Sequence, residues 1–153
     1  MAKQIVVGCD CAAVELKKLA IKVFEEQGYT VEDVGVNDAA DDTAYPLVAE
    51  KVARAIIDSG YTQEGALFCG TGIGMAITAN KFPGIYAAVC HDNYAAERLR
   101  LSNNGNVICM GARIIGPELA KKILREWCSL SFMGGPSADK VAKIKDLEKV
   151  LYK

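Results

Sequence analysis

Residues 65–74 read Gly65-Ala66-Leu67-Phe68-Cys69-Gly70-Thr71-Gly72-Ile73-Gly74. The apolar run predicts a buried strand that ends at a thiol, and the alternating glycines predict a tight turn into a helix that begins near Met75. Glycines at such a turn allow backbone N–H groups to converge, and the N-terminus of a helix adds partial positive charge. This segment therefore predicts a site for an anion, or for a developing oxyanion, next to Cys69.

The composition limits the classes of function. The chain has 153 residues, of which 51% are hydrophobic and 24% charged, with a net charge of −1. We expect a single globular domain, residues 1–153, with one core and without nucleic-acid or membrane partners, because there is no basic excess. No signal peptide or membrane span is recognised, so a cytoplasmic location is expected. The six cysteines lie mostly in apolar runs, which is typical of reduced, buried thiols.

Strand-like and helix-like segments alternate along the whole chain. Short apolar runs predict strands at residues 5–8, 29–35, 66–69, 85–90 and 107–110. Helical spacing predicts helices at residues 12–27, 46–60, 75–81, 92–102, from 117 onward and at 138–152, with an acidic loop at 37–42. Nearly uninterrupted strands separated by helices predict an α/β fold: a three-layer αβα, Rossmann-like sandwich around a five-stranded parallel sheet.

The expected order of the strands is the flavodoxin-like 2-1-3-4-5. In such a sheet, ligands bind beyond the carboxyl ends of the strands, where the strand order reverses between the first and third strands. The loops expected to meet there are Gly8-Cys9-Asp10-Cys11 and Cys69-Gly70-Thr71-Gly72-Ile73-Gly74. Both loops carry groups that can take part in chemistry.

Several motifs have the order and spacing seen in type B ribose-5-phosphate isomerases, and in part in the related galactose-6-phosphate isomerase subunits. They are Gly8-Cys9-Asp10, Tyr45-Pro46, Cys69-Gly70-Thr71-Gly72-Ile73-Gly74-Met75, Ala79-Asn80-Lys81, Cys90-His91-Asp92, Asn103 and Gly111-Ala112-Arg113. This resemblance covers nearly the whole chain. It implies an enzyme of carbohydrate metabolism that interconverts the aldose and ketose forms of a small sugar phosphate through a cis-enediolate, without a cofactor.

The resemblance also implies roles for individual residues. Cys69 is expected to be the base that moves a proton between C1 and C2, since a thiol beside backbone N–H groups has its thiolate favoured. Thr71 is expected to hydrogen-bond the thiolate or a substrate oxygen, and Asp10 to hold a sugar hydroxyl. The residues expected to bind substrate or an anion are Cys11, Gly70, Gly72, Ile73, Gly74, His91, Asn103, Arg113 and Lys140.

Four positions depart from the pattern of that family. Cys11 stands where the family has a histidine after Gly-Cys-Asp, and Ser102 where it has the histidine associated with ring opening. Pro136 and Lys140 replace two arginines that bind phosphate. Because serine is a poor substitute for imidazole, we expect an open-chain substrate such as a tetrose 4-phosphate. Because lysine lacks the arginine fork, a non-phosphorylated or carboxylated sugar is an alternative.

Other interpretations of the same residues stay open. Other candidates for holding phosphate are Arg98 and Arg100, which also fit a solvated helix face. The glycine turn resembles part of a dinucleotide fingerprint, and the replaced histidine and arginines are consistent with a catalytically silent sugar-binding module. Cys11, Cys69 and His91 have the ligand types of a zinc site, but no metal is expected because the isomerisation needs none.

The last predicted helix, residues 138–152, carries an apolar stripe. Its members are Val141, Ile144, Leu147, Val150 and Leu151. In the isomerases that this chain resembles, a phosphate site with residues from the last helix is completed across a subunit interface. A homodimer or a dimer of dimers is therefore expected, with this helix at the interface.

Overall fold

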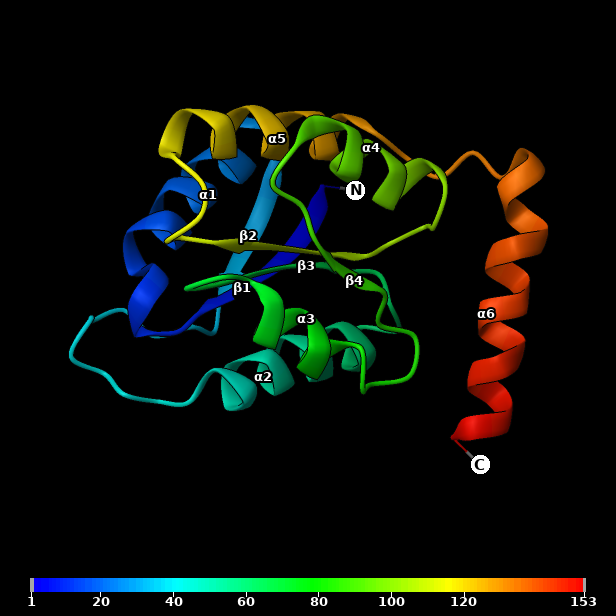
Figure 1. The fold of residues 1–153 in the computed structure, drawn as a ribbon, viewed down its shortest axis with the longest axis horizontal. Helices are drawn as coiled ribbons and strands as arrows, with labels where there is room; N and C mark the ends of the chain where they lie inside the picture. The colour runs from blue at the N-terminus through cyan, green and yellow to red at the C-terminus, as the bar shows by residue number, and fades with distance from the viewer. Residues whose placement is uncertain (1, 153) are drawn as a thin grey trace.

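The computed structural model describes residues 2–152 and has a parallel sheet between two layers of helices (Figure 1). The strands are β1 (Lys3–Cys9), β2 (Tyr29–Asp33), β3 (Glu64–Cys69), β4 (Ala87–Val89) and β5 (Val107–Gly111). The helices are α1 (Val14–Glu26), α2 (Tyr45–Asp58), α3 (Ile73–Ala79), α4 (Asn93–Leu101), α5 (Pro117–Ser129) and α6 (Ala138–Leu151), with short turns η1 (Cys11–Ala13) and η2 (Gly135–Ser137). The predicted three-layer α/β fold is confirmed.

The helices cover the two faces of the sheet unequally. α1, α4 and α5 pack together on one face, and α2 and α3 pack together on the other (Figure 1). α2 begins with Tyr45 and Pro46, and it buries Val48, Val52 and Ile56, which lie four residues apart and so share one side of the helix. This spacing is the signal by which the sequence predicted the helix, and the proline in its first turn fits the observed start.

The order of the strands differs from the expectation at one edge of the sheet. The observed order is β2-β1-β3-β5-β4, so the predicted order 2-1-3-4-5 is wrong. All five residues of β5 are buried, whereas the three residues of β4 are only partly buried. A short, half-buried strand suits the edge, and a fully buried strand suits the interior beside β3. The reversal between β1 and β3, on which the predicted site depends, is unaffected.

α6 stands apart from the sandwich, near the end of the sheet where β4 begins (Figure 1). Glu148 anchors it, because its carboxylate accepts hydrogen bonds from the Gly84 N–H at 2.7 Å and the Tyr86 hydroxyl at 2.8 Å. The apolar side chains of the predicted stripe are buried only at Val141, and Leu147 is 64% exposed. No helix within residues 2–152 is long and apolar enough to cross a bilayer.

Candidate active site

The loops that follow β1 and β3 meet at the carboxyl end of the sheet, as predicted. Cys9 and Phe68 are partners in the register of the two strands. The N–H of Asp10 donates to the carbonyl of Phe68 at 3.2 Å, which places Asp10 beside the next residue, Cys69. The Asp10 carboxylate accepts from the N–H of Ala12 at 3.0 Å and so caps η1.

Cys69 lies under the glycine-rich turn and is 5% exposed. Its Sγ accepts a hydrogen bond from the N–H of Gly72 at 3.0 Å, a contact that stabilises negative charge on sulfur. Gly72 has φ 79°, and a Cβ there would lie 2.9 Å from the backbone carbon of Met110. Only glycine combines this conformation with such a close approach, so the residue type at position 72 fixes the donor to the thiol.

The start of α3 leaves further N–H groups free of helical acceptors. The first helical hydrogen bond runs from Ala76 N–H to the Gly72 carbonyl at 3.1 Å, so the N–H groups of Gly74 and Met75 precede it. The hydroxyl of Thr71 accepts from the Ile73 N–H at 3.3 Å, whereas the hydrogen bond to Cys69 comes from Gly72. The turn thus presents backbone donors beside the thiol, the arrangement expected of an anion hole.

A second turn, residues 111–113, covers the Cys69 segment from the side of β5. The N–H of Ala112 donates to the Cys69 carbonyl at 2.8 Å, and that of Arg113 to the Gly70 carbonyl at 3.0 Å. The Arg113 Nη1 lies 3.1 Å from where a Cβ of Gly70 would be, so the guanidinium crosses the glycine turn. Arg113 is therefore the predicted cation that the fold brings next to Cys69 within one chain.

His91 follows β4, and its ring contacts the second turn. Its Nε2 accepts a hydrogen bond from the N–H of Gly111 at 2.8 Å, so the ring is neutral. Burial lowers the pKa of His91, and the nearby Asp92 carboxylate opposes this effect. Asp92 itself caps α4 through the N–H of Ala95 at 2.7 Å.

Two predicted residues lie away from Cys69 within one chain. Asn103 follows α4 and lies near the start of β3. It is three residues before Asn106, whose carbonyl accepts from the Gly65 N–H at 2.8 Å. Cys69 ends the same strand four residues further on, about 13 Å away along it. Lys140 is exposed on α6, which is anchored at the beginning of β4. A single chain does not bring Asn103 or Lys140 to the thiol.

Arg100 is buried between three elements of the fold, so its interpretation as part of a solvated helix face is wrong. It is 5% exposed, and its guanidinium lies 3.7 Å from the centre of the Trp127 ring. Its Nη2 lies 2.7 Å from a carboxylate oxygen of Glu64 as an ion pair, off the direction of a hydrogen bond, and its Nη1 donates to the Gly105 carbonyl at 2.9 Å. Arg98 is partly exposed, pairs with Glu97 and donates to the Ser102 hydroxyl at 3.3 Å.

Lys17 is a residue near the site that the sequence analysis missed. It is fully buried, and its ammonium lies 2.7 Å from Asp33, 2.7 Å from the Val36 carbonyl and 2.8 Å from Asn37. It thereby ties α1 to the loop after β2, which borders the Asp10 segment. A signal was present, because Lys17 falls at helical spacing with the buried residues Ala13, Ala20 and Phe24.

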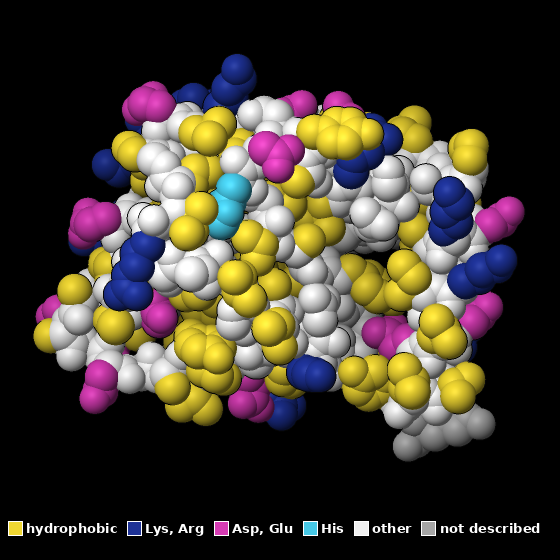
Figure 2. Space-filling view, in the orientation of Figure 1, with side chains coloured by type: hydrophobic (Ala, Val, Ile, Leu, Met, Phe, Trp, Pro, Cys, Tyr) yellow, Lys and Arg dark blue, Asp and Glu magenta, His cyan; other side chains and the backbone are white. Residues whose placement is uncertain are grey.

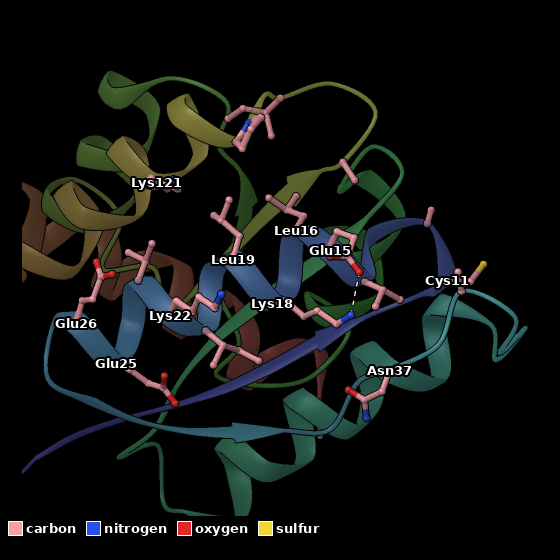
Figure 3. Close-up of a pocket in the computed structure, with 18 of the residues that line it drawn as sticks. Cys11, Glu15, Leu16, Lys18, Leu19, Lys22, Glu25, Glu26, Asn37 and Lys121 are labelled. Carbon is pink, nitrogen blue, oxygen red and sulfur yellow. Dashed lines mark hydrogen bonds and ion pairs between the residues drawn. The ribbon is translucent and has the colours of Figure 1, made fainter.

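A groove of 1330 Å³ runs between α1 and α5 and adjoins the site at one end (Figure 3). Cys11 is exposed at that end near Asn37, and Glu25 and Glu26 lie toward the other end. The side chains along α1 include the exposed ion pair of Lys18 with Glu15. Cys69 and the glycine turn do not line this groove, so its size does not mark the reacting centre.

Within residues 2–152, no three His, Cys, Asp or Glu side chains are grouped so that they could hold a metal ion. The six cysteines there carry free thiols, five of them buried and Cys11 exposed.

Comparison with known proteins places these residues in a family. Residues 5–144 match the family model described as Ribose/Galactose Isomerase. The chain belongs to this family. It is 51% identical over 140 residues to a D-erythrulose-4-phosphate isomerase of Pectobacterium atrosepticum, covering 92% of this chain and 91% of the relative. It is 43% identical over 145 residues to a ribose-5-phosphate isomerase B of Listeria innocua, covering 95% of this chain and 97% of that one.

The solved structures agree with the sequence comparison. The ribose-5-phosphate isomerase B of Clostridium thermocellum superposes with a TM-score of 0.90 at 38% identity, covering 97% of this chain and 99% of the other. The predicted family and enzyme class, a sugar-phosphate aldose–ketose isomerase, are therefore confirmed. The alternative interpretations, a nucleotide-binding module or a catalytically silent one, are set aside by this membership.

Proposed function

We propose that this isomerase interconverts a tetrulose 4-phosphate and the corresponding aldose, with Cys69 as the base. The thiolate removes a proton from C1 or C2 and returns it to the neighbouring carbon, while the hydroxyl proton passes from one oxygen of the cis-enediolate intermediate to the other. The N–H of Gly72 stabilises the sulfur when it carries the negative charge. The free N–H groups at the start of α3 stabilise the oxyanion of the enediolate, and Asp10 and Thr71 hold the neighbouring hydroxyls.

Ser102 is the observation that carries the choice of a tetrose. A pentose or hexose phosphate must open its ring before isomerisation, and that step needs a group that exchanges protons near neutral pH. The Ser102 hydroxyl, which accepts from Arg98 at 3.3 Å, is not such a group. A tetrose 4-phosphate has its O4 blocked and stays open-chain. The relative from Pectobacterium atrosepticum, which is 51% identical and named for D-erythrulose 4-phosphate, supports the same choice.

The test compares the turnover of several substrates by the wild type and by Ser102→His, a variant that restores the imidazole. The wild type is expected to have kcat/KM at least about tenfold higher for tetrose 4-phosphates than for ribose 5-phosphate. Ser102→His is expected to raise turnover of ribose 5-phosphate and to leave that of the tetrose nearly unchanged, while Ser102→Asn changes neither. A wild type that prefers ribose 5-phosphate, or turns over only carboxylated or unphosphorylated sugars, would contradict the proposal. Deuterium incorporation at C1 and C2 reports the proton transfer, and Cys69→Ala should abolish it.

A homodimer completes the site in this proposal. Asn103 and Lys140 lie at the opposite end of the sheet from Cys69 within one chain, so a second copy must supply them if they bind substrate. Hydrophobic side chains gather on the face over α2 and α3 and on α6 (Figure 2). Ile73 and Ile77 of α3 are 55% and 59% exposed beside the glycine turn. Large apolar side chains that are exposed together are typical of a surface that contacts another protein. We expect these surfaces to meet in a dimer located in the cytoplasm.

A further inference from the structure

His91 is connected to Cys69 through one backbone position. The register of the sheet places Gly111 opposite Cys69, and the imidazole Nε2 of His91 accepts the Gly111 N–H at 2.8 Å. A Cβ at position 111 would lie 2.5 Å from the Cα of Thr71, so the Gly111 backbone packs directly on the glycine turn. A shift of the Gly111 backbone would therefore displace both Cys69 and Thr71.

The imidazole takes the place of a strand carbonyl. β4 pairs with β5 up to Val89 and Cys109, and the Cys90 N–H still donates to the Cys109 carbonyl at 3.0 Å. Beyond this point the chain turns into α4, capped by Asp92, so the ladder no longer continues along Gly111. The side chain of His91 supplies the acceptor for Gly111, the residue from which the turn 111–113 departs.

The charges around the ring are few. Asp92 adjoins it on its own segment, and Arg113 lies on the facing turn with its guanidinium across Gly70. Burial raises the pKa of the Cys90 thiol to about 12 and that of Cys109 on β5 well above its usual value, so both stay neutral. On α5, Glu126 bonds the side chain of Asn93. Burial of the imidazole and the attraction of Asp92 therefore set its pKa, and burial has the larger effect.

We propose that His91 is a positioning residue for the isomerisation, which in its neutral form holds the turn 111–113 against the Cys69 loop and on protonation releases it. A protonated imidazole has N–H groups at both nitrogens and no lone pair for Gly111. Its two donors then face the donor of Gly111, and the turn that orients Arg113 loses one of its attachments. This inference rests on the proposed role of Cys69 as the base.

The proposal has a signature in the pH dependence of turnover. A base that must be unprotonated makes log kcat fall with a slope of about one toward acid. Protonation of His91 releases the turn and lowers kcat further, so the slope becomes steeper than one around the pKa of His91 in the folded protein. Because burial lowers that pKa, the steeper limb should begin below the ordinary value of about 6.5.

Two substitutions and one spectrum test the proposal. In His91→Gln the amide oxygen can accept from Gly111 at all pH values, so kcat should stay within about threefold of wild type and the slope should stay near one. In His91→Phe the acceptor is lost, and kcat should fall about tenfold at neutral pH without the steeper limb. A His91→Gln enzyme that keeps the steep limb, or a His91→Phe enzyme with wild-type kcat, overturns the proposal.

The spectrum separates this proposal from the assignment of the base and substrate. His91 is the only histidine, so its ring gives a single imidazole titration by NMR in the free enzyme. The amide signals of Gly111 and of residues 69–72 should shift with the same midpoint, and these shifts should vanish in His91→Gln. Amide signals whose chemical shifts do not change with the imidazole titration overturn the proposal, whatever the substrate is. Shifts that follow it in an enzyme whose Cys69→Ala variant stays active would instead contradict the role of Cys69.

Discussion

At the scale of single residues, Lys17 illustrates how a buried charge is retained beside a site. Removing an ammonium group from water costs several kcal/mol unless oxygen acceptors replace the water. The three donors of Lys17 are matched by Asp33, the Val36 carbonyl and Asn37, all within 2.9 Å. The same loop contacts β1, because the Cys9 thiol donates to the Val36 carbonyl at 3.3 Å. The network therefore fixes the path of the chain next to Asp10.

Replacing Lys17 should be costly although no substrate contact is lost. Lys17→Met leaves the Asp33 carboxylate and two further oxygens without their partner, and we expect a loss of about 3–5 kcal/mol in the free energy of unfolding. Urea denaturation measures this loss. The matched control is Lys18→Met on the same helix, because Lys18 is exposed and pairs with the exposed Glu15. Equal midpoints for the two variants would show that the buried network contributes no stability.

At the scale of elements, the sequence predicted the strands and helices but not the order of the strands in the sheet. Each strand from β1 to β5 overlaps a predicted strand. The inner strands β1, β3 and β5 are largely buried on both faces, which leaves a continuous pattern of apolar residues, whereas in the edge strand β2 only Tyr29 is buried. The run at 85–90 is as apolar as that at 107–110, so periodicity could not show that β4 shortens to three residues and moves to the edge. Which strand pairs with which depends on the packing of α4 and α5, and a local pattern does not contain this information.

The candidate site was predictable to the extent that it is local. The glycine turn, Cys69 and Asp10 follow from one strand-turn-helix pattern and one topological rule, and the structure brings them together. The contact of His91 with Gly111 depends on how two strands end, and the burial of Arg100 depends on Trp127 and Glu64 from other elements. A single charged residue on a predicted helix gives no sign of such partners.

Arg100 joins three elements, and its replacement should separate folding from substrate binding. It links α4 to Glu64 at the start of β3 and to Trp127 on α5. Arg100→Met should lower the free energy of unfolding by about 3 kcal/mol, because Glu64 loses its partner and Trp127 its stacked cation. KM for the sugar phosphate should stay within about twofold, because Arg100 does not reach the site. A large rise in KM without loss of stability would restore it as a phosphate ligand.

At the scale of the whole molecule, one chain separates groups that the proposed reaction needs together. The proposed base, Cys69, ends β3 at one end of the sheet, and α6 with Lys140 is anchored at the other through Glu148. α6 buries only Val141 in its own chain, and Leu147, Val150 and Leu151 are 64–76% exposed. A helix that packs so little on its own core is suited to carry a residue to a neighbour, and in the proposed homodimer catalysis would depend on the assembly.

Mixing inactive variants tests this dependence directly. Cys69→Ala and Lys140→Ala each impair both sites of a homodimer. The first removes the proposed base, and the second weakens the binding of phosphate. If Lys140 acts across the interface, a heterodimer of the two has one site with both lesions and one with neither. Random coexpression makes half of the dimers heterodimers, so about a quarter of wild-type activity should return above what the Lys140→Ala homodimer contributes.

The control for mixing uses two lesions on the same side of the interface. Asp10 lies beside Cys69 in one chain, so Cys69→Ala mixed with Asp10→Ala should recover nothing, since each site of the heterodimer keeps one lesion. Activity is measured with a tetrose 4-phosphate, and sedimentation confirms that both mixtures are dimeric. Recovery in both mixtures, or in neither, would mean that Lys140 does not complete the partner's site. Recovery of activity only in the mixture that contains Lys140→Ala would assign phosphate binding to α6 of the second subunit.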